Sequence, residues 1–424
     1  MRHRIVVLLS ALVLAACTAP TPQESPKTSS PSPDSTAPPE PTPTPTQPAA
    51  PSAEEQARLD QRLRQAAWDD DVRTARRLIE RGADVNAKDE TVQSAYLIAT
   101  SEGFLDLLDL TLQHGADVDD LDSFRGTGVI RAAERGHADV VGRLVTAGVD
   151  PDHVNRLGWV ALHEALVFAK PERRQQYLDT VRVLVAAGAD VTVRAERDGR
   201  SPAELAALHE LAPQSNLVRR AARSGQAPRA EAERRLLRAA AEGDADTVAL
   251  ALRQGARLEV RDDHERTPLL LAVAGDHLGA ARLLVHLGAD PDAVDDRRDT
   301  PWLVTGVTGN VAMGRLLLHA GADLTMRNRF GGLSPIPASE RGHVDYVRWV
   351  SGTDIDLDHV NDLGWTALLE AVVLGDGGQD HREIVRILLD AGADPAITDH
   401  HGRTALDLAR SRGHTQMVAI LQEA

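Results

Sequence analysis

Over most of the chain, apolar residues recur in short helical periods separated by polar turns. Within one such unit, Leu269, Ala272 and Val273 follow the i, i+3, i+4 spacing that places side chains on one face of a helix. A second apolar run, 280–285, ends shortly before Gly288, which can adopt the positive φ that stops a helix. The pattern predicts pairs of short helices, each too small to bury its apolar face without neighbouring pairs.

The turns after these helix pairs carry a glycine at a regular interval. The glycines stand at positions 82, 115, 148, 188, 255, 288, 321, 352 and 392. The intervals are 33, 33 and 40 residues from position 82 to 188, and 33, 33, 31 and 40 residues from position 255 to 392. Thr267-Pro268 and Thr300-Pro301 open helices with a capping hydroxyl followed by proline at the first helical position.

A period of 33 residues with these start and stop signals resembles the ankyrin repeat, from about Ala53 to Ala424. The resemblance implies an all-α ankyrin-repeat solenoid of helix-turn-helix repeats with turn or hairpin connections. One unit departs from the pattern, because Pro335 and Pro337 fall inside its first helix. We expect that helix to start late or to be distorted.

Two long segments of the repeat region are copies of each other. Eleven of fourteen positions are identical between Asp152–Ala165 and Asp358–Ala371, at an offset of 206 residues, and Glu134–Val141 matches Glu340–Val347 at the same offset. Duplication of a block of repeats explains a shared offset. The sequence therefore predicts two tandem arrays, a first at 53–215 and a second at 230–424, with residues 216–229 as the joint. That joint is either flexible or a pair of helices that continues the stack.

The first seventeen residues have the pattern of a secretory signal. Two arginines precede a twelve-residue apolar run at 5–16, which is too short to span a bilayer, and Cys17 follows it. Leu14–Cys17 resembles the lipobox of bacterial lipoproteins, in which the cysteine is lipidated after the leader is cut. The resemblance implies a signal peptide at 1–17, a lipid anchor on Cys17 and a place in the bacterial cell envelope, facing the extracytoplasmic side. An ordinary signal peptide with an incidental cysteine is the alternative.

Residues 18–52 contain twelve prolines and thirteen Ser or Thr, and no Val, Ile, Leu, Met or aromatic residue. Such a composition cannot bury a core, so we expect a disordered tether. The 47 basic and 63 acidic residues of the chain give a net charge of −16, and the charges up to Ser52 cancel. The repeat region is therefore acidic, which argues against nucleic acid as a partner. A single cysteine excludes an internal disulfide.

The duplicated segment contains residue types that are common in active sites. His153 and His359 fall in connecting turns, whereas His163 corresponds to Leu369, so a catalytic histidine at that place in both copies is excluded. The carboxylates of Asp354–Asp362 are spaced like the start of a calcium loop, but histidine stands where such a loop needs glycine. We predict scaffold at these positions, with no catalytic residue, no metal site and no cofactor.

Side chains that the repeat frame does not fix are the candidates for partner contact. Exposed Trp and Arg are common anchors of protein interfaces. The candidates are Trp68, Glu134, Arg135, Trp159, Glu340, Arg341 and Trp365. Packing against the adjacent repeat is the alternative role for each tryptophan, and Trp302 and Trp349 fall at apolar helix positions that predict core.

We therefore expect a membrane-anchored, extracytoplasmic protein-binding module that is not an enzyme, and whose partner contacts the concave surface of the solenoid. An inhibitor or immunity-type protein at the cell surface shares the fold and differs only in consequence. A metal-dependent hydrolase that uses the His and Asp residues of the turns is a further alternative.

Overall fold

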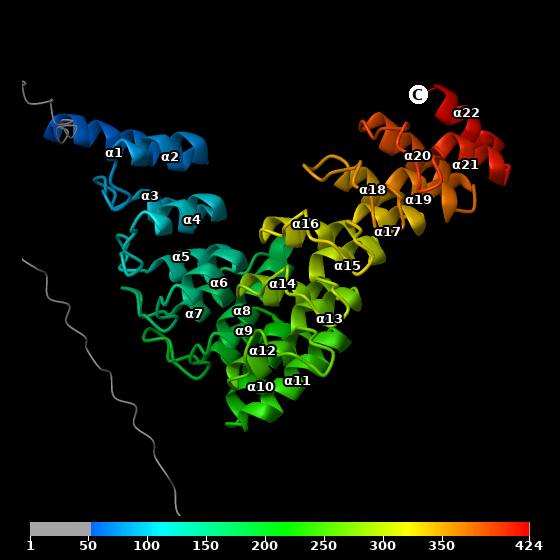
Figure 1. Cartoon of the computed structure of the whole chain (residues 1–424). Coiled ribbons are helices and arrows are strands. Elements are labelled where there is room, and N and C mark those ends of the chain that lie inside the picture. Colours follow the sequence, from blue (N-terminus) through cyan, green and yellow to red (C-terminus); the bar gives the residue numbers. More distant parts are fainter. Residues whose placement is uncertain (1–51, 424) are drawn as a thin grey trace, which may run out of the picture. The chain divides into compact units, whose positions relative to one another are not determined.

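The computed structural model describes residues 52–423, and Pro51–Ala424 forms one compact unit. Twenty-two α-helices follow one another in pairs within the described range (Figure 1), which contains one isolated bridge, between Thr398 and Thr404, and no strand. Each pair consists of a first and a second helix that pack together, and each first helix also packs on the first helix of the next pair within an array. The predicted fold class is confirmed.

The eleven first helices form one layer of the body. They are α1 (Ala53–Trp68), α3 (Ala95–Glu102), α5 (Gly128–Arg135), α7 (Ala161–Val167), α9 (Pro202–Leu208), α11 (Arg229–Glu242), α13 (Pro268–Ala274), α15 (Pro301–Thr308), α17 (Pro335–Glu340), α19 (Ala367–Val373) and α21 (Ala405–Arg412). The second helices form the other layer. They are α2 (Val72–Glu80), α4 (Leu105–Gln113), α6 (Ala138–Thr146), α8 (Arg174–Ala186), α10 (Ala212–Arg223), α12 (Ala245–Arg253), α14 (Leu278–His286), α16 (Val311–His319), α18 (Val344–Val350), α20 (Gln379–Asp390) and α22 (Thr415–Glu423).

We call α1–α10 the first array and α11–α22 the second array. For residues 216–229, the sequence allowed either a flexible joint or a pair of helices. This segment contains the end of α10 and the start of α11. A short 3₁₀ helix, Pro171–Arg173, precedes α8 in the first array. This insertion accounts for the longer repeat there, whereas residues 374–378 lengthen the corresponding repeat of the second array.

Local sequence signals set the helix boundaries. The hydroxyl of Thr267 accepts a hydrogen bond from the backbone N–H of Leu270 at 3.2 Å, and Thr300 caps α15 in the same way through Leu303 at 3.1 Å. Gly288 follows the C-terminal end of α14 and has φ +86° with open space around its α-carbon. A glycine there closes the helix without the strain that a side chain would add.

The helix with two prolines, α17, has six residues, whereas its counterpart α5 has eight. Allowing for the offset of 206, α17 begins one residue later. Pro335 and Pro337 both fall in its first turn, where a missing N–H removes no intrahelical hydrogen bond. The expectation of a late start is confirmed.

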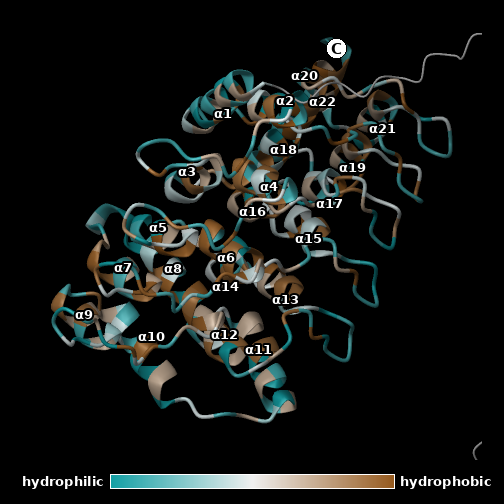
Figure 2. Cartoon of the chain, turned by 90° about the vertical axis from the view of Figure 1, so that its left-hand side faces the viewer, coloured by the Kyte–Doolittle hydropathy of each residue, from teal (hydrophilic) through white to brown (hydrophobic). Residues whose placement is uncertain are grey.

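The core consists mainly of Ala, Leu and Val from both layers, and Figure 2 shows apolar helix faces and polar connecting turns. Trp302 is fully buried, as predicted, with Tyr96, Tyr177 and Tyr346 among the other large buried side chains. Trp349 is half-buried and packs edge to face on Trp302, at a centroid distance of 6.2 Å. Thin layers of short helices leave room for few such rings.

The two arrays pack back to back through their second helices. Helix α8 lies along α12, and α6 and α8 both contact α14 (Figure 2). Arg182 of α8 forms an ion pair with Asp246 of α12 at 2.8 Å, and Arg253 of α12 donates to the carbonyl oxygen of Ala189 at 2.7 Å. The second helices α6 and α8 of the first array are therefore covered by α12 and α14 of the second array.

Candidate functional site

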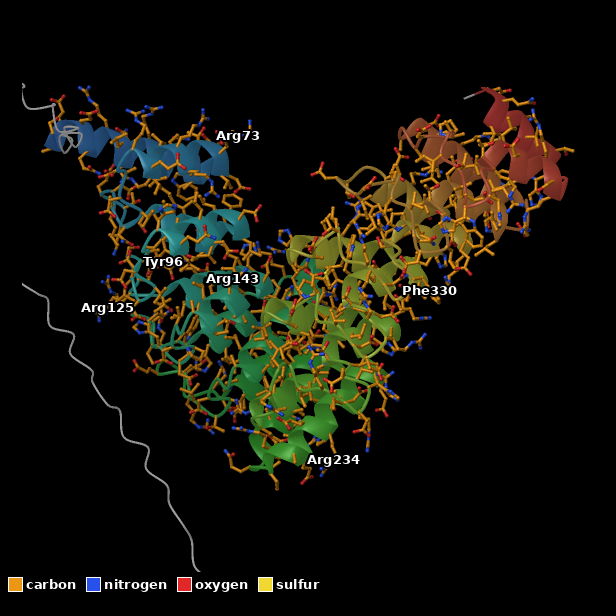
Figure 3. All side chains as sticks on the ribbon, in the orientation of Figure 1. Arg73, Tyr96, Arg125, Arg143, Arg234 and Phe330 are labelled. Atoms are coloured by element: carbon orange, nitrogen blue, oxygen red, sulfur yellow. The ribbon has the colours of Figure 1, made fainter. Side chains whose placement is uncertain are left out.

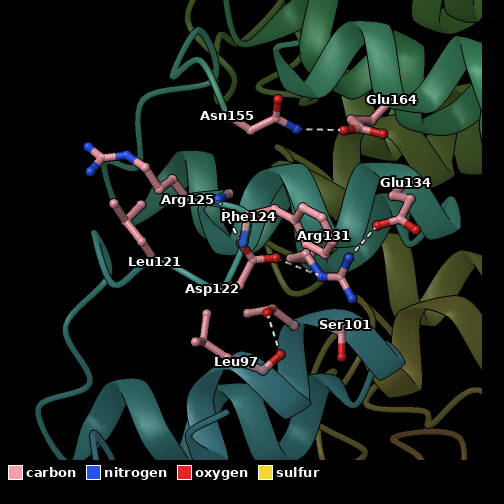
Figure 4. Close-up of polar contacts among 12 residues, drawn as sticks. Leu97, Ser101, Leu121, Asp122, Phe124, Arg125, Arg131, Glu134, Asn155 and Glu164 are labelled. Atoms are coloured by element: carbon pink, nitrogen blue, oxygen red, sulfur yellow. Dashed lines mark hydrogen bonds and ion pairs between the residues drawn. The ribbon is translucent and has the colours of Figure 1, made fainter. Parts of the chain in front are cut away.

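Two buried carboxyl groups occupy the same place in the two arrays. Glu164 of α7 accepts a hydrogen bond from the side-chain amide of Asn155 at 2.7 Å (Figure 4), and Glu370 of α19 accepts one from Asn361 at 3.0 Å. Both glutamates are only 4% exposed. The repeated motif thus places one Asn–Glu pair in each array, on the side where the turns meet the first helices.

Each asparagine also organises the turn before its helix. The Oδ1 atom of Asn361 accepts hydrogen bonds from the backbone N–H groups of Leu363 and Trp365, both at 3.0 Å. Aspartate does the same work in other turns, as Asp262 does for the backbone of Arg266 at 2.9 Å. Aspartate has no N–H to offer a neighbour, so asparagine is what allows the turn and the buried glutamate to be satisfied together.

Burial, assisted by the nearby carboxylate of Glu134 and opposed by the hydrogen bond from Asn155, raises the pKa of Glu164 to about 7. Burial likewise raises the pKa of Glu370 to about 7, assisted by Glu340 and opposed by the Asn361 hydrogen bond and by Arg341. Both side chains therefore change protonation state close to neutral pH.

Arg131 fills the space beside Glu164 in the first array. Its guanidinium group forms ion pairs with Asp122 at 3.3 Å and with Glu134 at 2.6 Å (Figure 4). A second arginine, Arg135, pairs with Glu102 of the preceding repeat at 2.6 Å. In the first array, carboxylates of the same array thus pair with both arginines.

The corresponding place in the second array is hollow. The residue at the position of Arg131 is Pro337, which is short and uncharged, and a cavity of about 490 Å³ lies between the turns and helices around it. Glu370, Glu340 and Arg341 line this cavity together with apolar side chains. Arg341 pairs with Glu340 at 2.9 Å. We call this hollow the Glu370 cavity.

Exposed apolar side chains recur at matching positions around the two sites. Three pairs at the offset of 206 are exposed in both arrays: Phe124 and Phe330, Val154 and Val360, and Phe168 and Leu374. Phe330, which is labelled in Figure 3, is 47% exposed, and the guanidinium of Arg329 lies 4.6 Å from the centre of its ring. Side chains that remain exposed and apolar in both copies mark a surface suited to a partner.

The predicted tryptophans lie in different environments. Trp68 ends α1 and is 46% exposed. Trp159 is half-buried and packs edge to face on Phe168, at a centroid distance of 6.2 Å. Trp365 is also half-buried, against the core. Of the three, Trp68 alone is an exposed ring, and the other two support the turns that carry the asparagines.

The predicted charged residues lie beside the buried glutamates. Glu134 and Glu340 are half-buried and raise the pKa of Glu164 and Glu370, respectively. Arg341 is exposed and lines the Glu370 cavity, whereas Arg135 is half-buried in its ion pair. Cys17 lies outside the described residues.

The histidines of the duplicated segment hold turns together. His153 hydrogen-bonds the carbonyl oxygen of Arg125 at 2.8 Å, and His359 hydrogen-bonds that of Gly331 at 2.6 Å. His163 contacts the carbonyl oxygen of Val193 at 3.2 Å in the following turn. These contacts give the predicted scaffold role a structural basis. Residues 52–423 contain no group of three or more His, Cys, Asp or Glu side chains arranged to hold a metal ion.

The sequence analysis did not single out Arg131, Asn155 or Asn361, and it considered Pro337 only for its effect on the helix. The signal was nonetheless present, because aligning the two blocks at the offset of 206 sets Arg131 against Pro337 inside an otherwise similar segment. A loss of charge and volume at one copy of a duplicated position predicts a difference in packing there.

Comparisons with known proteins agree with the repeat architecture. A family model described as ankyrin repeats in three copies matches residues 96–195, 236–328, 303–399 and 336–424. The ankyrin repeat protein YahD of Escherichia coli strain K12 is 46% identical over 94 residues, which are 22% of this chain and 47% of that protein. Human ankyrin repeat domain-containing protein 63 is 37% identical over 98 residues, 22% of this chain and 26% of that protein. The chain thus spans about half or less of the length of these relatives.

Among solved structures, an ankyrin repeat domain from Acinetobacter baumannii is 41% identical and superimposes with a TM-score of 0.43, covering 44% of this chain and 96% of that one.

None of the helices in residues 52–423 has the length and apolar character that crossing a lipid bilayer requires.

Proposed function

The chain belongs to the ankyrin-repeat family, and from that premise we propose that it is a protein-binding module of the bacterial cell envelope, tethered to the membrane by lipid on Cys17. Ankyrin repeats serve protein–protein interaction, and side chains on a constant frame provide the specificity. The matching pairs of exposed apolar side chains carry the proposal. Their clearest members, Phe124 and Phe330, lie on equivalent turns of the two arrays.

The extracytoplasmic location depends on the N-terminal pattern. The one cysteine of the chain, Cys17, directly follows the apolar run, as the lipobox requires, and residues 18–52 have the composition of a tether. Two or three acyl chains give stable attachment where one chain is marginal. The tether would present the arrays to an envelope or extracytoplasmic protein, and an inhibitor of such a protein would use the same surface.

Crosslinking in intact cells tests the binding role. Full-length tagged protein, crosslinked where it is naturally expressed, should recover a defined partner with crosslinks on the turns near Phe124 and Phe330. Recovery of no specific protein would contradict the proposal.

The anchoring has its own test. Cys17→Ser should move the protein from the membrane fraction to a soluble fraction, without changing the helical circular dichroism signal. If wild type and variant fractionate alike, Cys17 is not the anchor.

A further inference from the structure

The Glu370 cavity differs in charge from its counterpart, the corresponding place in the first array. The counterpart contains the arginines Arg131 and Arg135 and the acids Glu102, Asp122, Glu134 and Glu164. The cavity is lined by the arginines Arg297, Arg329 and Arg341 and the acids Asp299, Glu340 and Glu370. The place in the first array has two arginines and four carboxyl groups, whereas the cavity in the second array has three of each. With all carboxyl groups ionised, the place in the second array is therefore more positive by two charges.

Two neutral replacements contribute to this change. Thr308 lines the cavity at the position of Glu102, and Asn328 lines it at the position of Asp122. The Oδ1 atom of Asn328 accepts hydrogen bonds from the backbone N–H groups of Phe330 and Gly332, both at 2.9 Å. Its amide N–H groups have no partner among residues 52–423, so they are available to an acceptor in the cavity.

Protonation of Glu370 removes a negative charge from the cavity. Burial raises its pKa to about 7, so a large part of the population carries a neutral carboxyl group at neutral pH. A neutral carboxyl can donate a hydrogen bond, whereas a carboxylate can only accept. With Glu370 neutral, the side chains that line the cavity have an excess of one positive charge, inside a protein of net charge −16.

The remaining wall of the cavity is apolar. Val307, Phe330, Leu363 and Leu374 line it and are exposed to solvent. A ligand that fits such a hollow carries an apolar group and an anionic group close together. The C-terminal residue of a protein supplies both, because its side chain and its carboxylate branch from one carbon.

We propose that the Glu370 cavity receives the C-terminal residue of a protein partner, with an apolar side chain against Leu363 and Leu374 and the terminal carboxylate near Arg341 and Asn328. The proposal rests on the protein-binding role proposed above. The acidic body as a whole would repel an acidic segment of a partner much more strongly than a single terminal carboxylate. Capture of a C-terminal carboxylate by hydrogen-bond donors is a general mode of peptide recognition, and an Arg guanidinium group suits a carboxylate in particular.

Binding of short peptides to the full-length protein tests this directly. The probe is a fluorescein-labelled Gly-Ala-Leu peptide with a free C-terminus, measured by fluorescence polarisation. Its C-terminal amide should bind at least tenfold more weakly. An amidated Ala-Glu-Leu peptide, which offers a side-chain carboxylate and no terminal one, should be similarly weak. Equal binding of acid and amide, or equal binding of the glutamate peptide, would overturn the assignment.

Variants taken from the first array provide matched controls. Asn328→Asp introduces the residue that the first array has at this position, Asp122, in a turn of the same kind. It should weaken binding at least fivefold. Arg341→Gln should weaken it at least tenfold, whereas the equivalent Arg135→Gln should change it less than twofold. No effect of Asn328→Asp and Arg341→Gln would exclude the cavity as the binding place.

The pH dependence provides a further readout. Binding should weaken as pH rises through about 7, because ionised Glu370 repels the carboxylate, and Glu370→Gln should remove that dependence. Besides Glu370, the charged groups that line the cavity are Arg297, Asp299, Arg329, Glu340 and Arg341. If the peptides fail to bind while cell crosslinking still recovers a partner, this inference is wrong and the protein-binding role stands.

Discussion

The carbonyl oxygen of His286 in α14 lies so close to Gly142 in α6 that a Cβ atom at position 142 would overlap it. These two helices belong to different arrays, so their close approach fixes the arrays against each other. The absence of a side chain at position 142 is what allows it.

Gly142→Ala should therefore destabilise the contact between the arrays. Overpacking of this kind costs about 1–3 kcal/mol, because the backbones must move apart. Gly279→Ala on α14 is the matched control, since open space surrounds that glycine, and alanine there should stabilise the helix by about 0.5–1 kcal/mol. Urea unfolding midpoints measure both. A Gly142→Ala variant as stable as the control would show that the arrays do not depend on this contact.

Asn361 has two roles that substitution can separate. Asn361→Asp keeps the acceptor for the turn but loses the donor to Glu370, and should cost about 1–3 kcal/mol at pH 8. The cost should shrink at pH 5, where Glu370 is protonated and can donate to the new carboxylate. Asn361→Ala loses both roles and should be worse at either pH. An unchanged urea midpoint for Asn361→Asp at pH 8 would contradict the importance of the amide contact.

The buried glutamates should make stability depend on pH. The pKa of each glutamate is about 7 in the folded protein, whereas the ordinary value of 4.5 applies in the unfolded chain. The folded state therefore holds protons that the unfolded state has released, so this contribution is complete below pH 4.5 and is lost as pH rises through 7. The loss is at most about 3 kcal/mol per group.

The Glu164→Gln/Glu370→Gln double variant should show a smaller fall in stability between pH 5.5 and 8.5 than the wild type. Burial lowers the pKa of His137, His163 and His286, which acts in the opposite direction as pH rises. The informative quantity is therefore the difference between variant and wild type at each pH. A difference that does not change with pH would refute the titration of the two glutamates.

Arg131 provides a test of internal charge compensation. Arg131→Leu leaves the carboxylate of Asp122, whose side chain is 3% exposed, without its cation and should destabilise the first array by about 1–3 kcal/mol. Arg348→Leu on α18 breaks an exposed pair with Glu383 and should cost less than about 0.5 kcal/mol. Thermal unfolding compares the two, and equal effects would contradict a special role for Arg131.

Much of the architecture follows from local signals in the sequence. The glycine period, the threonine caps at Thr267 and Thr300 and the apolar helix faces predict stacked helix pairs, because each signal acts within one repeat. The duplicated segments also predicted two tandem arrays, because a shared offset of 206 residues indicates a duplicated block.

The packing of the arrays could not be predicted in this way. It depends on which outer faces of the second helices meet, and residues such as Gly142 and His286 are 144 positions apart without any shared motif. The Glu370 cavity was missed for a related reason. The cavity lies where Pro337 has neither the charge nor the length of Arg131. A motif search cannot find such a place, because it finds only residues that are present.

The proposed binding role depends on a protein-contact surface at the turns near Phe330. The most direct measurement is site-specific photo-crosslinking in intact cells, with a photoreactive amino acid at Phe330 or, as the control, at the exposed Arg386 of α20. We expect one discrete crosslinked partner from position 330 and none from position 386. No adduct at position 330, or the same adducts from both positions, would contradict it.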